Sequence, residues 1–248
     1  MKYSTALLVL FCLPILGNPQ HVFLIEDEVM DDDTKVIALI IRTTDDFDEA
    51  MDNLKDFVKD KHDLKLKKED NNTYMIEEVN LPHLSIKRGD LKTYLIQTDS
   101  AKILAFSFRL GYDISINSVE YPEEMTELKK LVLEYMEYNY HEHYMAQIDE
   151  KSKLLDKSVK ELRQNEDKIG SFQKKVSSLD NKYQKESDES KKAKIASDKN
   201  SLENEIETLT NQLPALRESV SEQEEVISEL KEEMNNYHQG IMSLQSSI

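Results

Sequence analysis

The heptad repeat between Leu202 and Ile241 is the feature that most limits what this chain can fold into. Apolar residues recur there in alternating steps of four and three, and only Gln223 interrupts the series. This spacing places one apolar stripe along a helix, which is typical of a coiled coil. The stripe consists of Leu202, Ile206, Leu209, Leu213, Leu216, Val220, Ile227, Leu230, Met234, Tyr237 and Ile241.

A weaker stripe precedes the first and predicts a partner helix. Pro122, followed by two acidic residues, is a typical helix start. Beyond it, only Gly170 and Pro214 interrupt the helical pattern before Gly240. The second stripe consists of Met145, Ile148, Leu155, Val159, Leu162, Ile169, Phe172, Val176, Leu179 and Tyr183.

Antiparallel pairing of the two stripes predicts a helical hairpin with a turn near residues 185–198. In the register that places Ile169 opposite Leu216, Gly170 and Pro214 fall within one residue of the same level. A proline inside a helix removes a hydrogen bond and costs about 3 kcal/mol, so we expect a hinge or bend there. The candidate helix caps at the turn are Ser187, Asp188, Ser197 and Asp198.

Other assemblies satisfy the same seam. Two chains with continuous helices can cross as an antiparallel dimer, and a parallel dimer is a third arrangement. We favour the monomeric hairpin because its free end at Ile248 returns beside the region around His141.

The first half of the chain has mixed periodicity and predicts a small, mainly antiparallel α+β domain. Residues 34–42 form an apolar run typical of a central strand, and residues 21–30 can add an edge strand. A helix follows, capped by Thr44 or Asp45. Its apolar face is Phe47, Met51, Leu54, Phe57 and Val58.

About four more strands are expected after this helix. The strongest is residues 103–108. Residues 70–72 (Asp-Asn-Asn) predict a turn, and residues 88–90 (Arg-Gly-Asp) predict a bend or loop.

Residues 1–17 have the form of a secretory signal peptide. Lys2 supplies a positive start, residues 6–16 are apolar, and Gly17 is a small residue suited to cleavage. We therefore expect export to the periplasm or outside the cell, with no stable membrane insertion after cleavage. Cys12, the only cysteine, lies in this segment, so the mature chain is expected to have neither disulfides nor cysteine metal ligands.

The net charge of −17 disfavours binding to nucleic acid, because phosphate groups are repelled by an acidic surface. The chain has no nucleophile elbow, phosphate-binding loop, dinucleotide fingerprint or zinc-ligand spacing. We therefore expect no enzymatic activity, no cofactor, and no catalytic, cofactor-binding or metal-binding residues.

Four groups of polar residues are candidate sites, and each has a simpler structural interpretation. In residues 135–144, rich in Tyr and His, His141 and His143 are two apart and point to different helix faces, which disfavours a metal site. Asp31-Asp32-Asp33 lacks the pattern of a calcium loop and predicts an acidic loop. The acids Asp45, Asp46, Asp48 and Glu49 suit a helix N-terminus. Lys87, Arg88 and Lys92 form a small basic group, expected to be solvated charges on strands.

The domain prediction is a signal peptide (1–17), an α+β head (18–121) and a coiled-coil arm (122–248). The leading hypothesis is a non-enzymatic exported protein whose head recognises a partner. Its arm would serve as a scaffold, spacer or adaptor in the cell envelope, through a protein partner or self-association. Two alternatives are a periplasmic chaperone that holds clients, and a ligand-binding or enzymatic head that the coil assembles.

Overall fold

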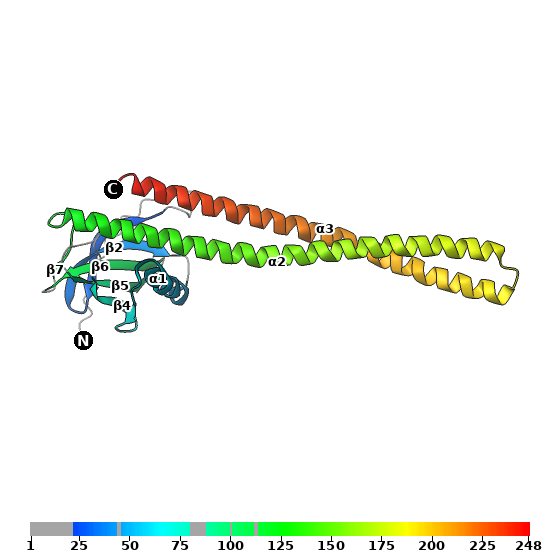
Figure 1. Ribbon diagram of the computed structural model, residues 1–248, viewed down its shortest axis with the longest axis horizontal. Coiled ribbons are helices and arrows are strands. Elements are labelled where there is room, and N and C mark those ends of the chain that lie inside the picture. Colours follow the sequence, from blue (N-terminus) through cyan, green and yellow to red (C-terminus); the bar gives the residue numbers. More distant parts are fainter. Residues whose placement is uncertain (1–21, 44–45, 80–87, 100, 112–113) are drawn as a thin grey trace. The chain divides into compact units, whose positions relative to one another are not determined.

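The computed structural model describes residues 22–43, 46–79, 88–99, 101–111 and 114–248 (Figure 1). The expected signal peptide lies outside the described residues. The chain forms two compact units. Unit 1 combines the chain up to Glu137 with Asn236–Ile248, and unit 2 is Tyr138–Asn235.

Unit 1 is built on a seven-stranded sheet with the order β1-β2-β6-β5-β4-β3, in which β7 also pairs with β6. Each of these strand pairs is antiparallel. With α1 (Phe47–His62), the sheet confirms the predicted α+β class, and β1 is the predicted edge strand. The strands are β1 (Leu24–Asp31), β2 (Thr34–Thr43), β3 (Lys67–Lys68), β4 (Thr73–Val79), β5 (Gly89–Gln97), β6 (Lys102–Leu110) and β7 (Ile114–Ser115).

The main core of unit 1 joins one face of the sheet to two helices. The ring of Tyr135 on α2 (Pro122–Lys185) lies 5.6 Å from that of Phe106 on β6 and 5.7 Å from that of Phe57 on α1. The Tyr135 hydroxyl donates a hydrogen bond to the carbonyl oxygen of Ala50 at 2.9 Å. Burial of each such side chain contributes about 1.5–3 kcal/mol. The first turns of α2 therefore belong to the core of unit 1.

The buried face of α1 consists of the predicted apolar residues. The residue at its N-cap position differs from the predicted one. Met51, Leu54, Phe57 and Val58 are buried together with Ala50. The N-cap position is Asp46, which makes no side-chain capping bond, while the predicted caps Thr44 and Asp45 lie outside the described residues.

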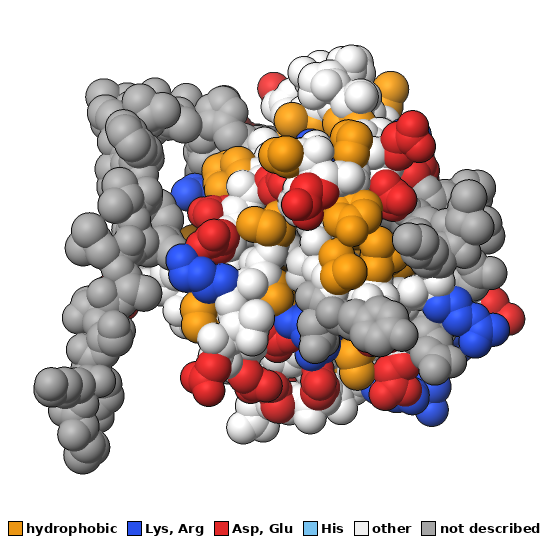
Figure 2. Space-filling view, turned by 90° about the vertical axis from the view of Figure 1, so that its left-hand side faces the viewer, with side chains coloured by type: hydrophobic (Ala, Val, Ile, Leu, Met, Phe, Trp, Pro, Cys, Tyr) orange, Lys and Arg blue, Asp and Glu red, His pale blue; other side chains and the backbone are white. Residues whose placement is uncertain are grey.

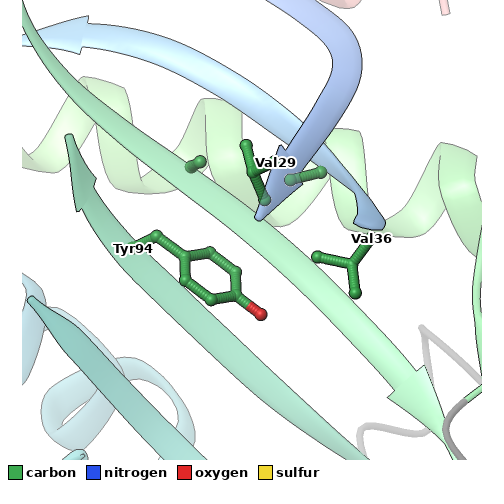
Figure 3. Packing of buried hydrophobic residues seen from close by; sticks show 5 residues of the cluster. Val29, Val36 and Tyr94 are labelled. Carbon is green, nitrogen blue, oxygen red and sulfur yellow. The ribbon is translucent and has the colours of Figure 1, made fainter. Parts of the chain in front are cut away.

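A second apolar cluster lies on the opposite face of the sheet. Because side chains alternate along a strand, Tyr94 points away from the face that holds its neighbour Thr93, the partner of Phe106. Figure 3 shows Tyr94 directed towards Val29 and Val36 across neighbouring strands. The cluster consists of Val29, Val36, Ala38, Tyr94 and Ala105.

The predicted bend at residues 88–90 is wrong, because Gly89 and Asp90 begin strand β5. Gly89 pairs with Leu110, and a β-carbon at residue 89 would lie 2.4 Å from the carbonyl oxygen of Arg109 and 2.5 Å from Cζ of Phe108. The glycine is needed for close packing inside a strand and not for a turn. The predicted turn at residues 70–72 is present. There the Asp70 carboxylate accepts hydrogen bonds from the backbone N–H groups of Asn72 (2.7 Å) and Thr73 (2.8 Å).

Helices α2 and α3 (Glu189–Gln245) confirm the predicted hairpin in unit 2 (Figure 1). Asp188 caps α3, because its Oδ1 accepts hydrogen bonds from the backbone N–H groups of Ser190 (2.9 Å) and Lys191 (3.2 Å). Of the other candidate caps, Ser187 lies in the turn, and Ser197 and Asp198 lie inside α3. The turn thus occupies only the first residues of the predicted range. No helix in the described ranges has an apolar stretch long enough to cross a membrane.

The register of the hairpin differs from the predicted one by about one heptad. Asn165 donates a hydrogen bond to Gln212 (3.4 Å), and Asp180 pairs with Lys199 (2.7 Å). In the predicted register, Asn165 would instead face Val220. A seam that repeats every seven residues is equally satisfied after a slip of seven. The early turn therefore decides between registers that the apolar pattern cannot distinguish.

Gly170 and Pro214 are not at the same level, so the structural basis for the predicted hinge is absent. In the observed register, Pro214 is level with the residue before Asn165. The two residues are separated by roughly 9 Å along the arm at 1.5 Å per residue. α3 continues through Pro214, whose side chain is exposed on the outer side of the helix.

The buried seam of α3 consists of the predicted residues. The buried seam of α2 differs from its prediction, because it includes a polar residue that the apolar pattern omits. All the predicted apolar residues from Leu202 to Ile241 are buried or half-buried. In α2, Asn165 is buried at a seam position between Leu162 and Ile169. Two residues of the predicted stripe are exposed instead, Met145 by 43% and Tyr183 by 44%. Because Asn165 fills this position, the α2 seam runs without a shift at Gly170.

Candidate interaction surface on the helical hairpin

Unit 1 contains a group of four charged side chains, of which Asp31, Lys92 and Arg109 are largely buried and Glu69 is 40% exposed. Lys92 on β5 lies 3.2 Å from Asp31 and 3.0 Å from Glu69, and Arg109 on β6 also pairs with Asp31. Burial lowers the pKa of Lys92, but its hydrogen bonds to Glu69 and Asp31 outweigh this effect and raise the pKa overall. Two cations face two anions, so the group is neutralised internally.

Tyr94 lies beside this charged group. Burial raises the pKa of Tyr94 well above its ordinary value, and the nearby Asp31 carboxylate raises it further. The phenol therefore stays protonated at neutral pH. Its hydroxyl is buried and makes no hydrogen bond of good geometry to another described residue. These features describe a stabilising network in the core more closely than a reactive site, because they provide no deprotonated nucleophile.

The polar residues weighed on the head from sequence do not form one site. Asp32 and Asp33 form the turn between β1 and β2, and Asp32 has the left-handed backbone angle φ 51°. Asp46 pairs with Lys102, which lowers the pKa of Asp46. The basic group is not assembled as expected. Lys92 is buried with acids, and Lys87 lies outside the described residues.

The Tyr- and His-rich segment is divided between the two units after Glu137. Tyr135 is a core residue of unit 1. In unit 2, Nε2 of His143 lies 2.5 Å from the side-chain nitrogen of Gln147, and His141 is exposed. The two histidines are not brought together, and no group of three or more potential metal ligands occurs among the described residues.

Unit 1 contains a small pocket that is lined in part by residues near the start of α2 and by residues near the C-terminus. Its volume is about 240 Å³, below the range of about 300–1,000 Å³ typical of small-molecule sites. Ile248 lines it together with Thr126 and Lys129, which lie in the first turns of α2. Figure 2 shows hydrophobic side chains interspersed with acidic ones on the face that it presents.

Basic and acidic residues are unevenly distributed along unit 2, which the net charge of the whole chain does not reveal. Residues 168–199, which include the turn, contain nine lysines against five acids. The remainder of unit 2, residues 138–167 and 200–235, contains seventeen acids against seven basic residues. The tip of the hairpin is therefore basic, although the whole chain carries a charge of −17.

Two lines of residues beside the seam form one surface, which we call the lateral face. On α2 the line repeats every seven residues, and on α3 it repeats at the same interval. Lys168 and Glu205, one from each line, border the same groove, so the two lines lie on the same side of the hairpin. The α2 line is Leu154, Glu161, Lys168, Lys175 and Lys182; the α3 line is Glu205, Gln212, Ser219, Val226 and Glu233.

Two shallow grooves open on the lateral face near the tip. The first has a volume of about 430 Å³, and Phe172, Thr208 and Leu209 contribute to its walls. The second, of about 370 Å³, is lined in part by Lys182, Lys185 and Ile195. The first groove combines apolar walls with Lys168 and Glu205, and the second combines the apolar side chain of Ile195 with two lysines and Glu186. This composition suits an apolar side chain flanked by carboxylates.

The part of the lateral face away from the tip has the opposite chemistry. Leu154 is 41% exposed and Val226 is 37% exposed, so both helices present an apolar side chain to solvent there. Glu222 and Glu229 are exposed one turn on either side of Val226. Sequence reasoning missed this face because it followed only the seam. The seven-residue spacing of Lys168, Lys175 and Lys182 is a signal that was available.

Comparisons of the chain with protein-family models, with curated proteins and with solved structures give no match. The geometry of the units is therefore the basis for any functional proposal.

Proposed function

We propose that this protein is a non-enzymatic exported protein in which an α+β head carries a coiled-coil arm that serves as an adaptor or spacer. The observation that carries the proposal is the lateral face. The apolar seams of α2 and α3 cover each other within one chain. The arm therefore needs no helix from another chain to complete its core. Its grooves, lysines and exposed apolar residues are available to a binding partner.

The head supports this proposal because its buried charged residues pair within the head and do not form a reactive site. The buried charges of Asp31, Lys92 and Arg109 are paired with one another, and the described pocket of unit 1 is small. Such a head suits recognition through its surface. Export is part of the proposal and rests on the form of residues 1–17. Mass spectrometry of the protein purified from its source should find a mature N-terminus after Gly17.

Site-specific photo-cross-linking in the source cells tests the arm. A benzoyl-phenylalanine residue would replace Lys175 on the lateral face. In a matched variant it would replace Lys160, an exposed lysine on the outer side of α2. We expect a discrete cross-linked product from position 175 and none from position 160. Equal products from both positions, or no product from position 175, would contradict an adaptor role for this face.

A further inference from the structure

We propose that the partner of the lateral face is a second copy of this chain, bound antiparallel around a twofold axis. This inference rests on the proposed function, because it names the occupant of the same surface. All the residues that carry it belong to unit 2. They form two sets on one face, a basic set with grooves and an acidic set with exposed apolar side chains.

The basic set lies towards the turn. Lys168, Lys175 and Lys182 are exposed and recur every seven residues, and Lys185 continues the group beside the second groove. Phe172 and Leu209 provide apolar walls in the first groove. In the described part of the chain, none of these four lysines has an ion-pair partner within 4.0 Å. The ammonium of Lys175 lies 5.3 Å from the centre of the Phe172 ring, a contact that leaves its charge, like those of the other three lysines, open to carboxylates of another molecule.

The acidic set lies further from the turn on the same face. Leu154 and Val226 are the exposed apolar residues, and both are large enough to enter a shallow groove. Glu161, Glu222 and Glu229 are exposed near them. Apolar side chains surrounded by carboxylates complement grooves that are edged by lysines.

A twofold axis brings the two sets together twice. Leu154 and Phe172 are separated by about 27 Å along α2 at 1.5 Å per residue. With an axis midway between them, close to Asn165 in level, Leu154 of each copy faces the Phe172 groove of the other. Lysines then face glutamates on both sides of the axis. A parallel arrangement would instead place lysines against lysines, so charge selects the antiparallel one.

Sedimentation equilibrium of the purified chain tests the dimer. We expect a mass of about twice 28.9 kDa at low salt and a shift towards the monomer when the salt concentration is raised, because exposed charges are screened. The charge reversals Lys175→Glu and Lys182→Glu together should raise the dimer dissociation constant by about tenfold or more. Glu222→Lys with Glu229→Lys should do the same.

Combining the four reversals should restore dimerisation, because opposite charges face each other again. The matched control, Lys160→Glu with Lys174→Glu, changes charge equally on the outer side of α2 and should dimerise normally. Circular dichroism of each variant confirms that the helices are intact. If none of the charge reversals changes the dimer dissociation constant, or if the quadruple variant stays monomeric, the proposal is overturned.

Cysteine cross-linking between copies tests the orientation. With Cys12 replaced by Ser, a Leu154→Cys chain mixed with a Thr208→Cys chain should form a cross-linked pair. A Leu154→Cys chain alone should not. Cross-linking of Leu154→Cys to itself would instead indicate a parallel dimer and contradict the proposal.

Failure of this inference is distinguishable from failure of the proposed function. A chain that is monomeric at every salt concentration overturns the second copy as the partner. If position 175 still photo-cross-links to another protein, the adaptor proposal stands. If position 175 gives no product at all, both proposals fail.

Discussion

Asn165 on α2 donates a hydrogen bond to the side-chain oxygen of Gln212 on α3, 3.4 Å away, from a seam position that is only 6% exposed. A buried asparagine in a coiled-coil seam lowers stability but selects one register, because other registers leave its amide unpaired. This pair therefore favours the register that the turn at Glu186–Asp188 also requires.

Replacing Asn165 by Leu should raise the melting temperature of the hairpin and allow a slip by one heptad. The measurement is cross-linking within one chain by a short thiol reagent, with Cys12 replaced by Ser. Asp180→Cys with Lys199→Cys reports the observed register, and Asp180→Cys with Ile206→Cys reports the slipped one. The second pair should react only when Asn165→Leu is present. If it stays unreactive, the turn alone fixes the register.

Replacing Asp31 by Asn should lower the free energy of unfolding by about 3–5 kcal/mol, because Lys92 and Arg109 would keep buried charges without their shared partner. The side chains of Asp31 and Lys92 are each only 11% exposed. Urea denaturation measures the loss. Glu28→Gln is the control, since the Glu28–Lys35 pair is exposed and its removal should cause no measurable change. Equal effects of the two substitutions would contradict a buried network.

Replacing Gly89 by Ala should destabilise the sheet by about 1–3 kcal/mol through overpacking. The added methyl group would lie 2.4 Å from the carbonyl oxygen of Arg109, so the strand or Phe108 must move. Gly111→Ala is the matched control, because nothing lies within 4 Å of its added carbon. Thermal unfolding compares the two variants. Similar melting temperatures would show that β5 tolerates a side chain at this position.

Replacing Gly170 or Pro214 by Ala should stabilise the arm. Each residue is unfavourable inside a helix, by about 1 kcal/mol for glycine and about 3 kcal/mol for proline. No atom lies within 4 Å of a carbon added at Gly170, so the alanine should fit without strain. Because the two residues lie at different levels, their effects on chemical denaturation should add. A marked departure from additivity would support a shared hinge.

The turn at Asp70 should make a pH-dependent contribution to stability. Hydrogen bonds from the backbone N–H groups of Asn72 and Thr73 lower the pKa of Asp70 below its ordinary value of 3.8. Since the folded pKa is depressed, the contribution is present above pH 3.8 and is lost as the pH falls through the folded pKa. Urea denaturation should show that Asp70→Asn is less stable than the wild type near pH 7. The difference should narrow as the pH falls further below 3.8, through the lowered pKa of Asp70. A difference that is independent of pH would exclude a role for the charge.

Local patterns determined much of the fold. The apolar run of residues 34–42 and the heptad stripe of α3 each identify an element, because a local sequence pattern reports directly which side chains of a strand or helix are buried. The same patterns are why Met51, Leu54 and Phe57 could be assigned to a core before their contacts were known. The Asp70 turn was equally local, since its hydrogen bonds span only three residues.

The tertiary structure decided what repeats and long-range contacts leave open. The seam of the hairpin is the same after a slip of seven residues, so its register depended on where the chain turned. Gly89 resembled a turn residue until Phe108 and the Arg109 backbone were found beside it, and Lys92 resembled a surface charge until Asp31 was brought to it from another strand. The lateral face depends in the same way on the pairing of α2 with α3. The sequence by itself determined the elements and their buried faces, because those follow from neighbours along the chain. Only the folded structure determined register, burial of charge and the lateral face, because each of these depends on residues far apart in the sequence.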